Sequence, residues 1–162
     1  MSRIALIVNG TSYQYPNVGE DPNWGEDATA WSQAVTQVLS TLLAPGDILE
    51  TKVSINNNTT VLTNVTGMLF DPGTVRAANI DYAIYRTSTS TPSGNSESGT
   101  ILISYDDSSA SGSKWQLSQR INAGAGVSFF ITDLGQVQYK ATDIGSAGYV
   151  GNIVFKAKVL SK

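Results

Sequence analysis

The 162-residue sequence contains neither cysteine nor histidine. Without cysteine, the chain has no disulfide with which to stabilise its fold. Without histidine, it lacks the commonest general base and the commonest transition-metal ligand. These two absences exclude a Ser-His-Asp triad, a Cys-His dyad and a typical zinc site.

Charged residues are scarce, at 14% of the chain, against roughly 25% in an average soluble domain. The net charge is −3. Because binding to a phosphate backbone normally requires clustered lysine and arginine, nucleic acid is not an expected partner. Serine, threonine, asparagine, glutamine and glycine dominate the polar positions instead, a balance typical of extracellular or particle-bound β proteins.

Long apolar runs are absent as well. The run over residues 4–8 is too short for the apolar core of a signal peptide, and no segment approaches the length needed to span a bilayer. We therefore expect no membrane partner and no export through a signal peptide.

The second half of the chain alternates apolar and polar residues. Over residues 153–159 the apolar side chains point to one side of an extended chain, while Lys156 and Lys158 point to the other. Several such runs separated by turn residues are typical of a sandwich or barrel. We predict a mainly β fold, an antiparallel, jelly-roll-like β-sandwich with strands over residues 47–55, 60–70, 80–87, 99–105, 114–121, 126–132, 136–142 and 149–160.

The first 18 residues have the pattern of a β-hairpin. A β-like run over residues 3–8 is followed by Asn9-Gly10 and a second run over residues 12–15. Asn-Gly between two such runs is a strong hairpin signal, because both central residues tolerate positive φ.

One N-terminal amphipathic helix follows. Glu26 and Asp27 place negative charge in its first turn, where the helix dipole favours it, and Pro45-Gly46 ends it. The apolar stripe has spacings of three and four residues and consists of Ala28, Trp31, Val35, Val38 and Leu42. Packing of this stripe into a core is favoured over a helix-mediated trimer seam, because the repeat is too short for a coiled coil.

Two groups of acidic residues have side chains that suit a metal or catalytic site. Asp106 and Asp107, with the serine that follows, offer oxygen ligands to Ca²⁺, but no EF-hand pattern surrounds them and a solvated turn is favoured. The acids at positions 20, 21, 26 and 27 surround a helix start, where capping explains them better than glycoside hydrolysis. We therefore predict no catalytic residue, no metal and no cofactor.

The glycine-rich segment over residues 122–126 resembles half of a phosphate-binding loop. Such a loop needs a helix after it, so that backbone amides point at the anion. A strand pattern follows here instead, which favours a simple turn between strands.

Residues 69–76 (LFDPGTVR) and 80–86 (IDYAIYR) resemble a β module that recurs in virion proteins of tailed bacteriophages. Later stretches extend the likeness to about half of the chain, at residues 99–102, 115–118, 126–139 and 148–158. The N-terminal Tyr13-Gln14-Tyr15-Pro16 and Trp24-Gly25-Glu26-Asp27 resemble the starts of phage head-decoration and fibre-type proteins.

This resemblance implies a non-enzymatic, homotrimeric virion protein that is capsid-surface or fibre-associated. A long fibre shaft or an enzymatic tailspike domain would need a longer chain, which favours a compact decoration or cement protein that binds the major capsid protein on the outer capsid surface. Residues 1–46 would form the attachment arm, and residues 47–162 would form a trimerising, outward-facing sandwich. Ordinary strand pairing within the monomer is an equal alternative for the arm residues. The residues expected to dock on the capsid are Ile4, Leu6, Tyr13, Tyr15 and Trp24.

Two alternatives remain at this point. The chain is a tail-fibre or collar component, a receptor-binding adhesin that holds host surface glycans on its loops, or it is a small glycan-active enzyme. For the adhesin, the predicted loops are residues 88–98 and 106–113. Their candidate surface residues are Thr91, Asn95, Asp106 and Asp107.

Overall fold

The computed structural model describes residues 4–8, 11–15, 24–42 and 46–162. In the first 45 residues, side chains are described only at Ser12, Gly25 and positions 28–39. The chain divides into two compact units, Met1–Ala44 and Pro45–Lys162. Mainly antiparallel β structure with one N-terminal helix confirms the predicted fold class.

The first unit contains a hairpin and a helix. Strands β1 (Ile4–Val8) and β2 (Thr11–Tyr15) pair antiparallel, while the predicted turn residues Asn9 and Gly10 lie outside the described residues. Helix α1 (Trp24–Leu42) contacts the hairpin. Its half-buried or buried positions include the predicted stripe residues 28, 31, 35 and 38, as expected for a helix with one apolar face.

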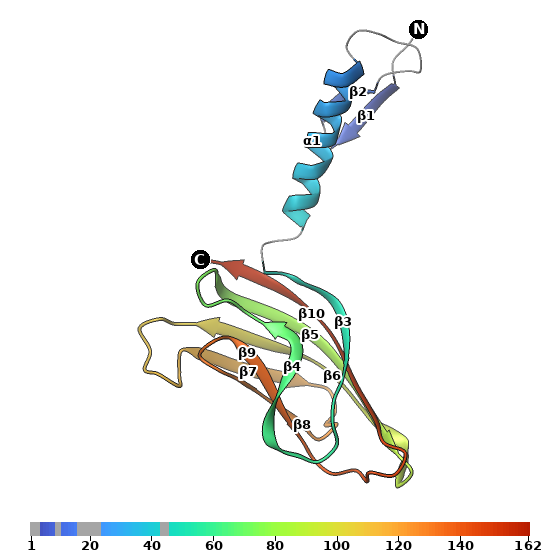
Figure 1. Cartoon of the computed structure of the whole chain (residues 1–162), viewed down its shortest axis with the longest axis vertical. Coiled ribbons are helices and arrows are strands. Elements are labelled where there is room, and N and C mark those ends of the chain that lie inside the picture. The colour runs from blue at the N-terminus through green and yellow to red at the C-terminus, as the bar shows by residue number, and fades with distance from the viewer. Residues whose placement is uncertain (1–3, 9–10, 16–23, 43–45) are drawn as a thin grey trace. The chain divides into compact units, whose positions relative to one another are not determined.

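The second unit is a sandwich of two sheets, and its long strands β10, β5 and β6 run side by side (Figure 1). The five-stranded sheet has the order β3 (Ile48–Ser54), β10 (Val150–Ser161), β5 (Val75–Ser88), β6 (Thr91–Tyr105) and β7 (Trp115–Ile121). The three-stranded sheet has the order β4 (Thr59–Leu69), β9 (Gln136–Ala141) and β8 (Val127–Ile131).

The core of the sandwich comes from the alternate residues that the sequence predicted. Along β10, residues 153, 155, 157 and 159 are buried, while Lys156 and Lys158 are exposed. Tyr82 on β5 meets Phe129 on β8 edge-to-face, with ring centroids 5.2 Å apart. Such pairs add stabilisation beyond the area they bury, so this contact helps to hold the two sheets together. Trp115 is buried as well.

The prediction of a loop over residues 88–98 is wrong. Strand β6 begins at Thr91, and the β5–β6 ladder continues through Arg86 opposite Asn95 to Ser88 opposite Thr91. Thr91 and Asn95 are therefore half-buried strand residues rather than loop-tip residues. The serine, threonine and glycine content suggested a loop, but cross-strand hydrogen bonds and the Ser88 hydroxyl, which accepts from the Thr91 amide at 3.1 Å, favour a strand. Asp106 and Asp107 do lie in an exposed connection, between β6 and β7.

Candidate assembly surface on the five-stranded sheet

The outer face of the five-stranded sheet carries a row of polar side chains that crosses all five strands. The row runs Glu50 (β3), Lys156 (β10), Asp81 (β5), Thr100 (β6) and Arg120 (β7). The ladder pairs Lys156 with Asp81, Asp81 with Thr100, and Thr100 with Arg120. A bulge in β3 sets Glu50 beside Lys156 rather than in a one-to-one pair. We call these five residues the charged row.

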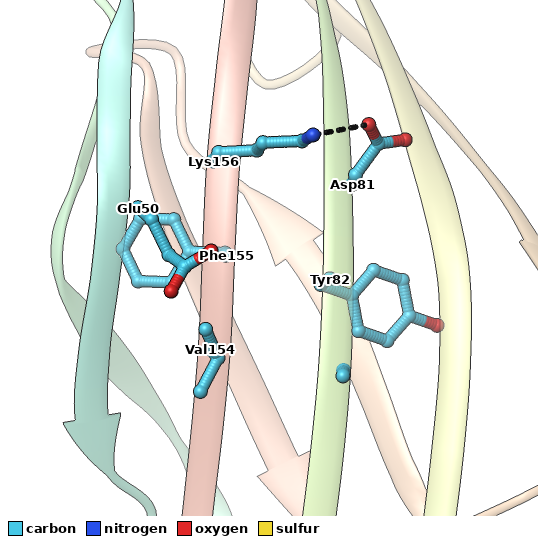
Figure 2. A pocket seen from close by; sticks show the side chains of 7 residues that line it. Glu50, Asp81, Tyr82, Val154, Phe155 and Lys156 are labelled. Atoms are coloured by element: carbon cyan, nitrogen blue, oxygen red, sulfur yellow. Dashed lines mark ion pairs between the residues drawn. The ribbon is translucent and has the colours of Figure 1, made fainter.

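Alternation in the sequence builds the charged row. In β10 and β5, Lys156 and Asp81 each lie between two buried neighbours, so their side chains point away from the core. Figure 2 shows Glu50, Lys156 and Asp81 on three adjacent strands. The Lys156 ammonium lies 3.8 Å from the Asp81 carboxylate, and the Thr100 hydroxyl donates to the same carboxylate at 3.3 Å. Both charged groups are mostly exposed, which makes this pair weakly stabilising by itself.

Shallow hollows flank the row. One is lined by Glu50, Asp81, Val154 and Lys156 among others (Figure 2). A second is lined by Ser98, Thr100, Arg120 and their neighbours.

An apolar groove of about 390 Å³ lies on the same face, toward the end of β10. Its lining includes Ala77, Leu102 and Leu160. Leu102 and Leu160 are 40% and 69% exposed. At the other end of the face, Tyr85 and Val150 are also exposed. The outer face therefore combines charges of both signs with exposed apolar side chains.

A buried arginine holds the loops at one end of the sandwich. Arg86, on β5, is 0% exposed. Its Nε donates to the Tyr149 hydroxyl at 3.2 Å, and one terminal nitrogen donates to the Ala125 carbonyl at 2.7 Å and the Thr142 hydroxyl at 3.5 Å. The other terminal nitrogen donates to Asn57 Oδ1 at 2.9 Å and the Thr142 carbonyl at 2.5 Å. These acceptors can satisfy all five N–H groups of the guanidinium.

Arg86 therefore joins three connections that are far apart in the sequence, because Thr142 and Tyr149 lie at the two ends of the β9–β10 connection. Asn57 follows β3, Ala125 precedes β8, Thr142 follows β9 and Tyr149 precedes β10. Because every acceptor is neutral, the guanidinium acts here as a hydrogen-bond hub rather than as one half of an ion pair.

Glu97 is the acidic counterpart of this hub. It lies on β6, is 3% exposed and accepts from the Tyr82 hydroxyl at 2.6 Å, the Gln119 amide at 3.1 Å and the Ala125 backbone N–H at 2.6 Å. The Ala125 peptide thus donates to Glu97 and accepts from Arg86. Burial, followed by the hydrogen bond to Glu97, raises the pKa of the Tyr82 phenol well above its ordinary value.

Sequence reasoning missed the roles of Arg86 and Glu97, although a signal was present. Arg86 follows Ile80, Tyr82 and Ile84 on the inward parity of its strand, and Glu97 shares the inward parity of Ile101. A charged residue at an inward position has to be buried with partners, so parity alone identifies both residues. The turn predicted over residues 122–126 is where these two side chains meet the Ala125 backbone.

The connection after β6 is fixed by carboxylates. Asp106 accepts from the backbone and hydroxyl of Ser108, at 3.0 and 2.6 Å, and from the Ser109 hydroxyl. Asp133, from the β8–β9 turn, accepts from the Gly112 amide at 2.5 Å. These hydrogen bonds lower the pKa of Asp106 and, led by the Gly112 amide, that of Asp133 below the ordinary aspartate value. Asp106 therefore has the hydrogen bonds of a turn residue.

Asp107 is held differently. It accepts from the Tyr105 hydroxyl at 2.9 Å and lies 3.2 Å from the Lys114 ammonium. The first of these bonds, more than the second, lowers the pKa of its carboxyl. Among the residues described, no group of three or more acidic, histidine or cysteine side chains is placed to hold a metal ion.

The predicted docking residues belong to the first unit. The hairpin register sets Ile4 opposite Tyr15 and Leu6 opposite Tyr13, and Trp24 is the first residue of α1. The backbone positions of all five are described, but their side chains lie outside the described residues. Their role in attachment stays a prediction. No helix in the part of the chain that the structure describes is long and apolar enough to cross a membrane.

No known family model and no curated protein matches this chain. Among solved structures, the tailspike protein of Acinetobacter phage vB_ApiP_P1 is similar, with a TM-score of 0.33 and 15% sequence identity. The similarity covers 71% of this chain and 21% of the tailspike chain. The chain therefore spans about a fifth of the length of this phage structural protein.

Proposed function

We propose that the chain is a non-enzymatic structural subunit of a phage particle that acts by binding other copies of itself and the surface of the particle. The outer face of the five-stranded sheet carries this proposal. It joins a row of opposite charges to exposed apolar side chains on a surface made of regular strands. Such a surface is suited to contact with another protein.

The more specific role that we propose is a homotrimeric decoration protein on the outer capsid surface. It rests on the phage-like segments at residues 69–76 and 80–86, which are integral to the sandwich: Asp71 accepts from the Gly73 amide at 2.8 Å, and Arg86 is the buried hub. A subunit that binds only the assembled shell stabilises that shell by mass action.

The carboxylates of the sandwich support a structural role over a catalytic one. Asp47 accepts from the Val159 amide at 2.8 Å and lies 2.7 Å from the Lys158 ammonium, which fixes the start of β3 against β10. Asp133 holds the connection after β6, and Glu97 holds the turn before β8. Each of these acids is engaged in fixing a loop or a strand end.

An add-back experiment tests this function. Particles of the encoding phage that lack the chain are incubated with the purified protein, sedimented and heated. We expect a saturable number of copies to sediment with the particles and to raise the temperature at which the genome is released. Sedimentation with isolated tails but not with heads would contradict the decoration role and favour the adhesin, which a host-glycan array then examines. Failure to bind either part would contradict the virion role itself.

A further inference from the structure

The charged row is asymmetric across the sheet. Its acidic end is Glu50 on the edge strand β3, and its basic end is Arg120 on the opposite edge strand β7. Four inter-strand spacings of about 4.8 Å separate these strands by roughly 19 Å. Glu50 and Arg120 therefore cannot pair with each other within one chain, and neither makes an ion pair with any other residue that the structure describes.

A second copy of the same face supplies the missing partners. When two such faces meet about an axis that runs along the strands, the direction of the row is reversed in the second copy. Glu50 of one copy then lies against Arg120 of the other at both ends of the row, and at its centre the two Asp81 carboxylates, each paired with Lys156 of its own chain, face each other. The opposite charges at the two ends of the row favour a second copy over a partner surface with a single sign of charge.

We infer that the outer face of the five-stranded sheet is the contact between copies of this chain, with Glu50 of one copy bound to Arg120 of the next. The inference rests on the self-association in the proposed function and assigns that association to one surface. The groove lined by Ala77, Leu102 and Leu160 lies beside the row and supplies the apolar part of the contact.

The size of the face agrees with this assignment. Strand β10 has 12 residues, which at about 3.4 Å per residue give a length of roughly 40 Å. A face of about 19 by 40 Å has an area on the order of 700 Å², close to the roughly 800 Å² per partner that a stable interface buries. Most of the face has to be covered, so the contact includes both the charged row and the apolar groove.

Charge reversal tests the contact, because Glu50 and Arg120 are too far apart to affect each other within one chain. The variants are Glu50→Arg, Arg120→Glu and the double variant Glu50→Arg/Arg120→Glu, and light scattering after size exclusion measures their assembly. Lys140→Glu, on the exposed side of β9 in the other sheet, is the matched control for charge. Circular dichroism establishes that each variant is folded.

We expect each single reversal to raise the dissociation constant at least tenfold, because like charges then face each other. The double variant is expected to return to within about threefold of wild type, and Lys140→Glu to assemble as wild type does. Mixing the two single variants restores a two-copy assembly if the axis is two-fold. Within a ring of three copies, at least one mismatched contact remains after mixing.

Two results would overturn the assignment. If the single reversals assemble as well as wild type, or if the folded double variant is as weak as the singles, this face is not the contact. Either result leaves the proposed virion function standing. If the wild-type chain stays monomeric even at a protein concentration 100-fold above the one that light scattering needs, self-association itself is overturned. Recovery of a two-copy assembly would support this surface as the contact and contradict the homotrimer.

Discussion

Replacement of Arg86 by methionine probes the hub that joins the loops of the sandwich. Methionine preserves much of the volume and removes all five N–H donors. The Ala125 carbonyl, which lies in a buried contact, then loses its side-chain donor, and four partly buried acceptor groups lose theirs. The variant thus isolates the hydrogen bonds of the hub from its packing.

The expected loss of stability follows from those acceptors. A buried acceptor left without a partner costs about 1–3 kcal/mol, and the partly buried ones cost less because water reaches them. Removal of the guanidinium also removes its own desolvation cost, which offsets part of the loss. We expect a net loss of about 4 kcal/mol, within the range for breaking a buried polar network. Of a total stability of roughly 5–15 kcal/mol, this is a large fraction.

Urea unfolding followed by circular dichroism at one fixed protein concentration measures this loss. Arg76→Met is the control, since Arg76 is an exposed arginine on the same strand, and a surface change of this kind is expected to stay within about 0.5 kcal/mol. If Arg86→Met lost less than about 1 kcal/mol, the hub would contribute little and water would be satisfying its acceptors. The physical account of the loop network would then be refuted.

Two further predictions concern the loops. Gly126 has a φ of +72°, and a Cβ there would overlap the Thr142 hydroxyl. Gly126→Ala should therefore lower the unfolding free energy by at least about 2 kcal/mol. In the control Gly124→Ala, the added Cβ meets no neighbouring atom, so the unfolding free energy should change by less than about 0.5 kcal/mol. Equal effects of the two substitutions would contradict this reasoning. The lowered pKa of Asp133 means that its bond to the Gly112 amide is fully present above the ordinary aspartate pKa and is lost as pH falls through the lower folded-state pKa. Hydrogen exchange of the Gly112 amide, corrected for intrinsic rates, should accelerate only in that acidic range, and protection that is independent of pH down to full protonation would contradict the assignment.

Period-two alternation was sufficient to predict most of the sandwich. The core and solvent faces of β10 and β9 follow directly from it, because successive side chains of a strand point to opposite faces, and the buried face requires apolar residues whereas the solvent face requires polar ones. The prediction of a loop after Ser88 failed for a reason that is also physical. The composition of this stretch favours turns, whereas the ladder with β5 extends past Asn95 to Thr91, and such tertiary pairing overrides local preference.

The candidate surface was less accessible to sequence reasoning than the fold. Alternation identifies which residues of a strand face outward, but the charged row depends on the order β3-β10-β5-β6-β7 and on the register between strands. Neither follows from one strand alone. The acceptors of Arg86 come from segments 29 to 63 positions away, and no local pattern brings them together. The docking role of the predicted arm residues stays a prediction, because their side chains lie outside the described residues.

Cryo-electron microscopy of the intact phage particle tests the central claim, that the chain is an assembled structural subunit of the virion, most directly. The account predicts density for the sandwich on the outside of the capsid at three-fold or quasi-three-fold positions, with the outer faces of the five-stranded sheets turned toward one another and Glu50 of each copy next to Arg120 of its neighbour. Density restricted to the tail would contradict the decoration role. Purified particles with no density for the chain anywhere would contradict the claim itself.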